Sequence, residues 1–479
     1  MAAYQFRDMY RYLVLTISLF GFMIISSNTF AFNLAVVCMG STENNTVLES
    51  FPPIDYSPYE VSQINWAVGL GTALATIPFS ELFTRFGARI PFLIALIVSS
   101  IATFLFPFAA EYNFYSMLFL RFLQGFTFAA DFSSIGLVTS KWASLKQSGF
   151  FLSVLCCYVA LSTGLTNSIG GMICKSSFGW PYVYFGHGAI GIILSVLWWL
   201  VYEDKPNECA RVSSVELEKI QRNRNMNEIN GSAEPIPYKQ LLRDPIIWSF
   251  WLNGFAEILA SAFVQMYAAY YIKNALHFGV EATGYLSGLT TAAQCPTRLV
   301  FGFLADKWRT VGEDFKVKLF NTITLFGGGI FMLAIGLCPE HLPIVAVVAF
   351  VCFNLVTGFS TVSFCKAIVL YSRQHGHFVM GVCQFMNCVE MFLGPAMVAF
   401  FVHDETNKTE WIPVFGIMSG CMILASIVFL KWSSAHPPAY IAEGMFVEDD
   451  IEKAKNIAVN AVVPIQVDQL NGVPQKTTA

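Results

Sequence analysis

One stretch decides the fold of this chain: Gly302-Phe303-Leu304-Ala305-Asp306-Lys307, which follows one long apolar segment and precedes another. A degenerate counterpart occupies the same setting earlier in the chain, Ser80-Glu81-Leu82-Phe83-Thr84-Arg85-Phe86-Gly87. We interpret both stretches as cytoplasmic turns. A turn that recurs once in each half of a hydrophobic chain is typical of a membrane protein built from two parallel six-helix halves, with the turn after the second helix of each half.

The composition indicates a chain that lies in lipid. Of its 479 residues, 55% are hydrophobic and only 13% are charged, and the mean hydropathy is +0.56. This is too apolar for a soluble enzyme with a hydrated surface. The formal net charge of -4, without a basic stripe, argues against a nucleic-acid partner. The 12 cysteines form no CxxC pair, so we interpret them as buried hydrophobic residues and predict neither metal site, cofactor nor disulfide framework.

Apolar runs of about 20 residues, long enough to cross the hydrocarbon core as helices, recur on both sides of a polar central stretch. The predicted fold is therefore an all-α membrane protein with about 12 transmembrane helices in two six-helix halves. The runs are 12–39, 61–84, 90–110, 114–139, 148–175, 181–202, 246–273, 282–305, 317–338, 343–370, 378–402 and 411–431. The predicted segments are an N-terminal segment 1–11, a first bundle 12–202, a central loop 203–245, a second bundle 246–432 and a largely disordered tail 433–479.

Lysine and arginine accumulate at one end of the predicted spans. By the positive-inside rule, this end and both termini are cytoplasmic. The sequons at Asn44 and Asn407 fall in loops at the other end, so both are predicted glycosylation sites. In the central loop, Ser213 and Glu216 have the spacing of a capping box and predict a short helix to about Arg222. We predict a multi-pass protein of the plasma membrane or of an endolysosomal or vesicular membrane.

A charged side chain near the bilayer centre costs about 2.5–3.5 kcal/mol on insertion scales, so each one needs a partner or a wet cavity. On a helix, Gln124, Gly125 and Phe128 share roughly the face of Arg121 and leave a small-residue gap beside a fixed positive charge. This predicts an anion site with Arg121 and Gln124. The structural alternative is that Arg121 only ties helices together.

Three further polar side chains are candidates for contact with a substrate. They are Asn33, Asn65 and Lys366. The asparagines are as readily explained as interhelical hydrogen-bonding groups, and Lys366 as a side chain that extends to the membrane surface.

Intramembrane carboxylates are candidates for ion coupling. Glu257 lies in a helical row with Asn253, and Glu390 ends a polar arc that contains Asn387. Asp131 follows Arg121 on the same span. Such groups can carry protons, or they can make structural hydrogen bonds to a neighbouring helix.

Charged and glycine residues at the cytoplasmic ends are predicted to gate the cavity. These are Arg85, Gly87, Arg298, Gly302, Asp306 and Lys307.

Several of these stretches carry a family resemblance. In the first half they are RFLQG at 121–125, SKWA at 140–143 and GWPYVYFG at 179–186; in the second half they are GFLADK at 302–307, Gly358-Phe359, and Met380-Gly381 through Gly394-Pro395. Together they resemble solute carrier family 17 of the major facilitator superfamily, which includes sialin, vesicular glutamate transporters and sodium–phosphate type I carriers. The resemblance implies a twelve-helix carrier of organic anions or phosphate that works by alternating access. In it, Arg121 matches the family's fourth-helix arginine, which is implicated in anion binding.

The chain departs from the glutamate carriers at several positions. Their first-helix Arg, second-helix His, fourth-helix Glu and seventh-helix Arg correspond here to Ala31, Asn65, Phe128 and Ala256. These losses argue against glutamate as the substrate and against proton coupling by the usual residue. Asp131 and Glu257 lie within a few positions of the lost groups, which suggests a relocated proton site.

The sequence therefore predicts a secondary active transporter of a small organic or inorganic anion, not an enzyme. It works by alternating access, coupled to a gradient of H+ or Na+, with the small-molecule anion, the coupling ion and the lipid bilayer as partners and a monomeric transport unit. One alternative is a carrier of cationic or neutral solutes. Another is a membrane sensor or scaffold that no longer transports.

Overall fold

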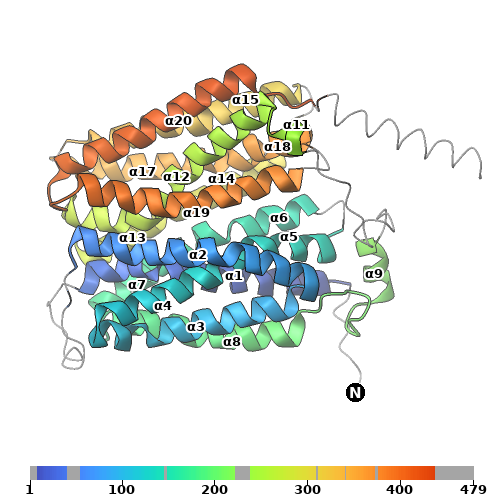
Figure 1. Cartoon of the computed structure of the whole chain (residues 1–479), viewed down its shortest axis with the longest axis horizontal. Helices are drawn as coiled ribbons and strands as arrows, with labels where there is room; N and C mark the ends of the chain where they lie inside the picture. Colours follow the sequence, from blue (N-terminus) through green and yellow to red (C-terminus); the bar gives the residue numbers. More distant parts are fainter. Residues whose placement is uncertain are drawn as a thin grey trace, which may run out of the picture.

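The computed structural model describes residues 8–39, 54, 56–144, 148–221, 238–308, 311–339, 341–372, 376–436 and 438. Within these ranges every regular element is a helix. Figure 1 shows two bundles, one lying on the other: the first is drawn in blue to green and the second in yellow-green to red. This architecture confirms the predicted all-α membrane fold.

The helices follow the chain in two sets joined by two short segments. The first bundle contains α1 (Tyr10–Met39), α2 (Pro58–Phe86), α3 (Arg89–Tyr112), α4 (Phe114–Phe128), α5 (Ala130–Trp142), α6 (Ser148–Cys156), α7 (Tyr158–Lys175) and α8 (Pro181–Val201). The connection contains α9 (Ser214–Gln221) and α11 (Tyr238–Leu241). The second bundle contains α12 (Pro245–Asn274), α13 (Val280–Ala292), α14 (Gln294–Lys307), α15 (Glu313–Asn321), the π-helix η2 (Thr322–Gly327), α16 (Gly328–Gly336), α17 (Pro343–Thr357), the 3-10 helix η3 (Gly358–Val362), α18 (Phe364–Ser372), α19 (Gly376–Phe401), η5 (Lys408–Trp411) and α20 (Ile412–Trp432).

All twelve predicted apolar runs lie on helices, but several helices are broken near their middle. The breaks fall at Ala129, Cys157, Ala293 and Ser363. Among the described residues, nine helices are long and apolar enough to cross a membrane. The other three runs correspond to the broken pairs α4/α5 and α13/α14 and to α19. Broken helices at membrane depth leave backbone groups free to bind side chains or solutes.

The two stretches predicted to be turns are helical for most of their length. Residues 302–307 form the end of α14, and residues 80–86 form the end of α2. The turn after α2 is confined to Gly87 and its neighbours. Gly87 has φ +73°, and a Cβ there would collide with the carboxylate of Asp204. The physical reason is that Leu, Ala and Lys favour helix, so each helix continues to its last charged residue.

Asp204, which follows α8, binds the N-terminus of α3. Its Oδ1 accepts hydrogen bonds from the backbone nitrogens of Ala88 at 2.6 Å and Arg89 at 3.1 Å. A carboxylate at a helix N-terminus satisfies free amides and complements the helix dipole. Burial raises the pKa of Asp204 despite these bonds. Gly87 is required here because it leaves room for this carboxylate.

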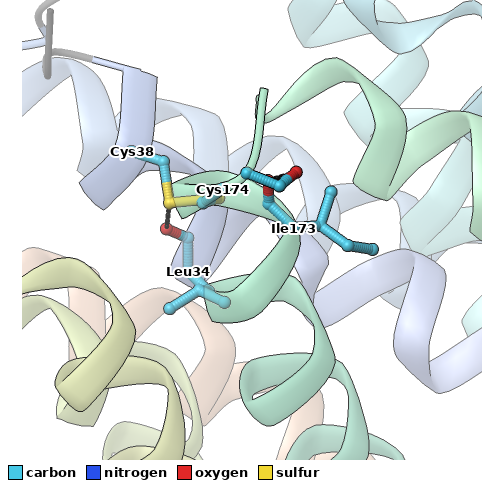
Figure 2. The surroundings of a disulfide bond; sticks show 5 residues. Leu34, Cys38, Ile173 and Cys174 are labelled. Carbon is cyan, nitrogen blue, oxygen red and sulfur yellow. Dashed lines mark hydrogen bonds between the residues drawn. A yellow bond between two sulfur atoms is a disulfide. The ribbon is translucent and has the colours of Figure 1, made fainter. Parts of the chain in front are cut away.

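The two ends of the bundles are chemically different. At one end, called here the disulfide end, α1 and α7 finish side by side and Cys38 is bonded to Cys174, with their Cα atoms 6.1 Å apart. Figure 2 shows the bridge between the last turns of the two helices. This corrects the prediction that the cysteines are only buried hydrophobic residues; the other ten are free. The opposite end, called here the α9 end, carries α9 and the start of α1 (Figure 1).

The predicted helix in the central loop is present as α9, but its capping differs from the prediction. The Ser213 hydroxyl accepts from the Glu216 nitrogen at 3.1 Å. The Glu216 carboxylate, however, turns to α1 and accepts from the backbone nitrogens of Tyr10 at 3.1 Å and Arg11 at 2.9 Å. Glu216 is completely buried. The central loop is therefore fastened to the first bundle through the free amides of the α1 N-terminus.

Replacing Glu216 by Ala is expected to lower the stability of the protein. The change removes two hydrogen bonds to a charged group, each worth about 1.5–3 kcal/mol, and leaves two amides of α1 unsatisfied. The measurement is the thermal unfolding temperature of the purified protein in detergent. Glu218 is the matched control because it lies on the same helix with its side chain exposed. Equal unfolding temperatures for E216A and E218A would refute this role.

Candidate functional site

Arg121 is the best-defined polar feature inside the membrane. It lies on α4 in the interior of the first bundle with a relative exposure of 1%. Its Nη1 donates to the Thr29 carbonyl at 2.7 Å and to Gln124 Oε1 at 2.8 Å. Its Nη2 donates to Asn65 Oδ1 at 3.3 Å. The guanidinium carbon lies 5.0 Å from the centre of the Phe32 ring, so α1, α2 and α4 together hold this group in place.

The charge of Arg121 is not neutralised by the protein. All of its described acceptors are neutral oxygens, and within the described ranges no carboxylate contacts it. Its Nε makes no hydrogen bond. A buried charge without a counter-charge is unfavourable by several kcal/mol. Among the described residues the Arg121 guanidinium therefore has hydrogen-bond acceptors but no counter-charge.

The small-residue gap predicted beside Arg121 is occupied by protein. A Cβ at Gly125 would collide with the backbone of Val68 on α2, because this glycine lets α2 and α4 pack at close range. The Phe128 ring packs edge-on against Phe30 at 5.7 Å. Gln124 donates from Nε2 to Thr103 on α3 at 2.9 Å and so orients the oxygen that meets Arg121.

Polar groups around Arg121 retain unused hydrogen-bonding capacity. Asn65 Nδ2 and the Tyr184 hydroxyl are buried and have no hydrogen-bond partners among the described residues, and Tyr184 lies near Arg121. Asn33 donates to the Gln265 carbonyl on α12 at 3.4 Å, while its Oδ1 is unused. Such orphaned groups are rare in protein interiors unless water or a ligand serves them. These groups come from α1, α2 and α8 and lie near Arg121 or at the contact with α12.

Two carboxylates form a second polar cluster in the other bundle. Glu257 on α12 and Glu390 on α19 are 5% and 1% exposed and interact electrostatically. Ser360 on η3 is a hydrogen-bonding neighbour of Glu257, and Arg298 on α14 also acts on it. Among the described residues, Glu257 Oε2 and both oxygens of Glu390 lack hydrogen-bond partners. The cluster thus gathers two acids and one base around the break between α17 and α18.

Asp131 and Lys366 belong to neither cluster. Asp131 is fully buried on α5, just beyond the helix break, and neither of its oxygens has a hydrogen-bond partner in the described part of the chain. Tyr158 on α7 is its electrostatic neighbour. Lys366 on α18 lies with its ammonium 3.0 Å from the Glu313 carboxylate. This pair sits at the start of α15, at the α9 end, so in this conformation Lys366 serves as an ion-pair partner there.

The residues predicted to gate the cavity fall into three groups. Arg298 donates from Nη1 to the Cys156 carbonyl at 2.9 Å, a group of the other bundle that lies next to the break between α6 and α7. Arg85 pairs with Glu81 one turn away on the same exposed helix face. Gly302, Asp306 and Lys307 lie on α14, but their side chains are outside the described part of the structure.

The bundles meet most closely at the disulfide end. There α7 packs against α13. A Cβ on Gly171 would stand 2.9 Å from the Gly284 Cα, and a Cβ on Gly284 would stand 2.6 Å from the Asn167 carbonyl oxygen. Lys175 forms an ion pair with Glu281 across the same seam. Small residues allow helices to approach at backbone distance, so this end is closed.

The two bundles also touch at two places away from the contact between α7 and α13. On one side, the Cys295 sulfur lies 3.8 Å from the Cys157 carbonyl oxygen. On the other side, α2 packs against α19, and Trp66 Nε1 donates to the Phe392 carbonyl at 3.0 Å. The two bundles are thus in contact through α7 and α13 and through α2 and α19.

Of the two predicted glycosylation sites, the structure describes one. Asn407 is exposed at the disulfide end, where its Oδ1 accepts from the Thr409 nitrogen at 3.2 Å. Asn44 lies outside the described residues.

Comparison with known proteins decides the family. A family model described as Major Facilitator Superfamily matches residues 12–395. The chain belongs to this superfamily. As a major facilitator it is a multi-pass membrane protein, in agreement with its helices.

Human sialin is 23% identical over 88% of both chains. Rat sodium-dependent phosphate transport protein 1 is 24% identical over 77% of this chain and 79% of its own. The resemblance to solute carrier family 17 is confirmed, at the low identity of a divergent member.

Solved structures of other major facilitators share the fold. The inward open xylose transporter XylE from E. coli superimposes with a TM-score of 0.66 at 13% identity, covering 88% of this chain and 96% of that one. A bacterial homologue of the human lysosomal transporter Spinster gives 0.63 at 14% identity, covering 89% and 98%. At these identities the likeness shows the fold alone.

Two tyrosines near the site were missed in the sequence. Tyr184 lies in the stretch that carried the family resemblance, and Tyr267 on α12 lies beside Ser62 and Asn65. Both are buried; the Tyr184 hydroxyl has no hydrogen-bond partner among the described residues, and Ser62 and Asn65 are hydrogen-bonding neighbours of the Tyr267 hydroxyl. A tyrosine in an apolar run has the same pattern as a core aromatic residue, so periodicity alone does not separate the two.

Proposed function

We propose that this major facilitator is a secondary active transporter of a small organic or inorganic anion, with Arg121 as the anion-binding residue. The observation that carries the proposal is a buried guanidinium that has no acidic partner in the described structure. An anion supplies the missing counter-charge, and the free Nε and the Asn65 amide supply further donors.

The contacts between the bundles support alternating access as part of this proposal. Arg121 is out of contact with solvent in this conformation, and the seam between α7 and α13 closes the disulfide end. A solute reaches Arg121 only after the two bundles tilt apart. Each tilt must break contacts such as the one from Arg298 to Cys156, which is why we assign Arg298 to the gate.

The relatives support an anion but do not select one. Sialin is a relative over most of the chain, and others are named sodium-dependent phosphate transport proteins or a probable urate exporter. The orientation also belongs to the proposal: the α9 end is cytoplasmic by the positive-inside rule. The disulfide supports it, because disulfides persist on the oxidising, non-cytoplasmic side.

Uptake by purified protein in liposomes tests the function. Labelled phosphate, urate, sialate and glutamate are compared with an organic cation, with and without an imposed H+ or Na+ gradient. Saturable uptake of at least one anion, competed by the others and not by the cation, supports the proposal. Saturable uptake of the cation alone would favour a cation carrier. Absence of all uptake by protein that remains folded would favour a sensor or scaffold.

Neutralising Glu257 and Glu390 together is expected to uncouple transport from its driving gradient. Both carboxylates are buried, and Glu257 Oε2 and both oxygens of Glu390 have no hydrogen-bond partner among the described residues. Replacement by Gln keeps their shape while removing the charge that binds a cation. Counterflow of the anion at equal concentrations continues, whereas concentrative uptake driven by H+ or Na+ is lost. Exposed Glu111 replaced by Gln is the control.

The same assay examines Asp131, the third candidate for coupling. If E257Q/E390Q still concentrates the anion and D131N does not, the coupling site lies in the first bundle. If neither variant changes the gradient dependence, none of these carboxylates couples the ion.

A further inference from the structure

A groove lies on the outside of the second bundle, between the start of α12 and the end of α20. Its volume is about 420 Å3. Its walls are formed by Arg243, Pro245, Trp248, Ser249, Leu252, Val428 and Trp432. It is separate from the Arg121 site, which lies in the interior of the other bundle, and nothing in the transport scheme uses it.

The groove has a charged end and an apolar end. Arg243 is exposed and makes no ion pair in the described part of the chain. Its neighbour Asp244 is occupied elsewhere, since one oxygen caps α12 at the Ile246 nitrogen and the other accepts from Tyr371. The Lys431 ammonium lies 5.3 Å from the centre of the Trp432 ring. One positive charge, Arg243, therefore lines the groove, a second, Lys431, lies next to its Trp432 wall, and the lining contains no acidic side chain.

The aromatic residues place the groove at the edge of the membrane. Trp248 and Trp432 are 55% and 48% exposed, and they line its two sides. Tryptophan prefers the level of the lipid headgroups, where its ring is apolar and its N–H is polar. Below this level, α12 contributes Leu252 and α20 contributes Val428. The α20 surface next to them carries exposed Leu424 and Ile427, which continue as a lipid-facing stripe.

We propose that this groove is a binding site for one anionic phospholipid, whose phosphate contacts Arg243 and Lys431 and whose acyl chain lies along Leu252 and Val428. Charge complementarity selects an acidic headgroup, because basic residues near the surface attract anionic lipids. The apolar lower wall selects a lipid over free phosphate, because phosphate has no group to bury there. The leaflet is the cytoplasmic one if the orientation proposed above holds; the binding itself does not depend on transport.

The test measures lipid binding directly, so that it stands apart from the transport assays. Detergent-purified full-length protein is titrated with phosphatidylglycerol or phosphatidylcholine and the bound lipids are counted by native mass spectrometry. Phosphatidylglycerol is expected to bind more tightly than phosphatidylcholine. R243A is expected to weaken phosphatidylglycerol binding about fivefold, the equivalent of one basic residue near the surface. The matched control is K239A, because Lys239 is also exposed at this end but does not line the groove.

Two further variants keep the result interpretable. R243K is expected to retain most of the affinity because the charge remains, and V428W is expected to fill the groove and block binding without changing charge. An equal loss of phosphatidylglycerol affinity in R243A and K239A would show that the lipid is held by nonspecific electrostatic attraction, and this would overturn the proposal. So would displacement of the bound lipid by millimolar inorganic phosphate, or undiminished binding to V428W.

Discussion

Replacement of Arg121 by Ala is expected to reduce anion uptake by at least about 30-fold. Truncating one member of a buried charge pair costs about 2–5 kcal/mol, and each 1.4 kcal/mol is a factor of ten in affinity. R121K keeps the positive charge but loses the planar guanidinium group, which donates hydrogen bonds to Thr29, Gln124 and Asn65 at the same time. It is therefore expected to transport with intermediate activity.

The controls separate binding from packing. Q124A removes one of the hydrogen bonds to Arg121 but leaves its charge, so it reports the structural contribution. Binding of the transported anion is followed as the rise in unfolding temperature that it causes. For R121A we expect this rise to vanish while the protein remains folded without anion. If R121A keeps the anion-induced rise, Arg121 ties helices together and the anion binds elsewhere.

Replacement of Gly284 by Leu is expected to prevent closure of the disulfide end and to lower the maximal rate of uptake by more than about tenfold. The added side chain would meet the Asn167 carbonyl at 2.6 Å and Gly171 at 2.8 Å. Backbone at such distances cannot yield without moving α7 from α13, and overpacking typically costs about 1–3 kcal/mol. The closed state becomes the minor one, and every transport cycle must pass through it.

Closure can be measured without transport. Cysteines placed at Lys175 and Glu281, which form an ion pair across the seam, are joined by a short bifunctional thiol reagent. The yield of cross-linked protein is expected to fall in G284L. It is expected to remain high in the controls G186L and G420L, because a Cβ at either of these helix glycines meets open space. A normal yield in G284L would show that the seam tolerates the side chain.

The sequence predicted the helices well because a membrane demands long apolar runs, and such runs are visible in one dimension. The break at Ala293 also had a local signal, since Pro296 cannot donate to the helix turn before it. The break at Ala129 had none, because alanine is the best helix former. Stretch 302–307 was predicted as a turn because it lies between two long apolar segments and recurs in each half, but α14 continues through it to Lys307.

The candidate site was predicted only in part. Arg121 was recognisable because an arginine in an apolar run needs an explanation. Its partners Thr29, Asn65 and Gln124 come from three helices, and no periodicity along one helix indicates such a meeting. The pairing of Cys38 with Cys174 was missed for the same reason: each cysteine lies near the end of an apolar run, and only the packing of α1 on α7 brings the two together.

The bridge between Cys38 and Cys174 joins two helices of one bundle, not the two bundles. A covalent bond inside a rigid body moves with it, so the alternating access proposed above would neither stretch nor relax the sulfur pair. We therefore expect this bond to persist through every transport cycle and to keep the end of α1 attached to α7 when the disulfide end opens.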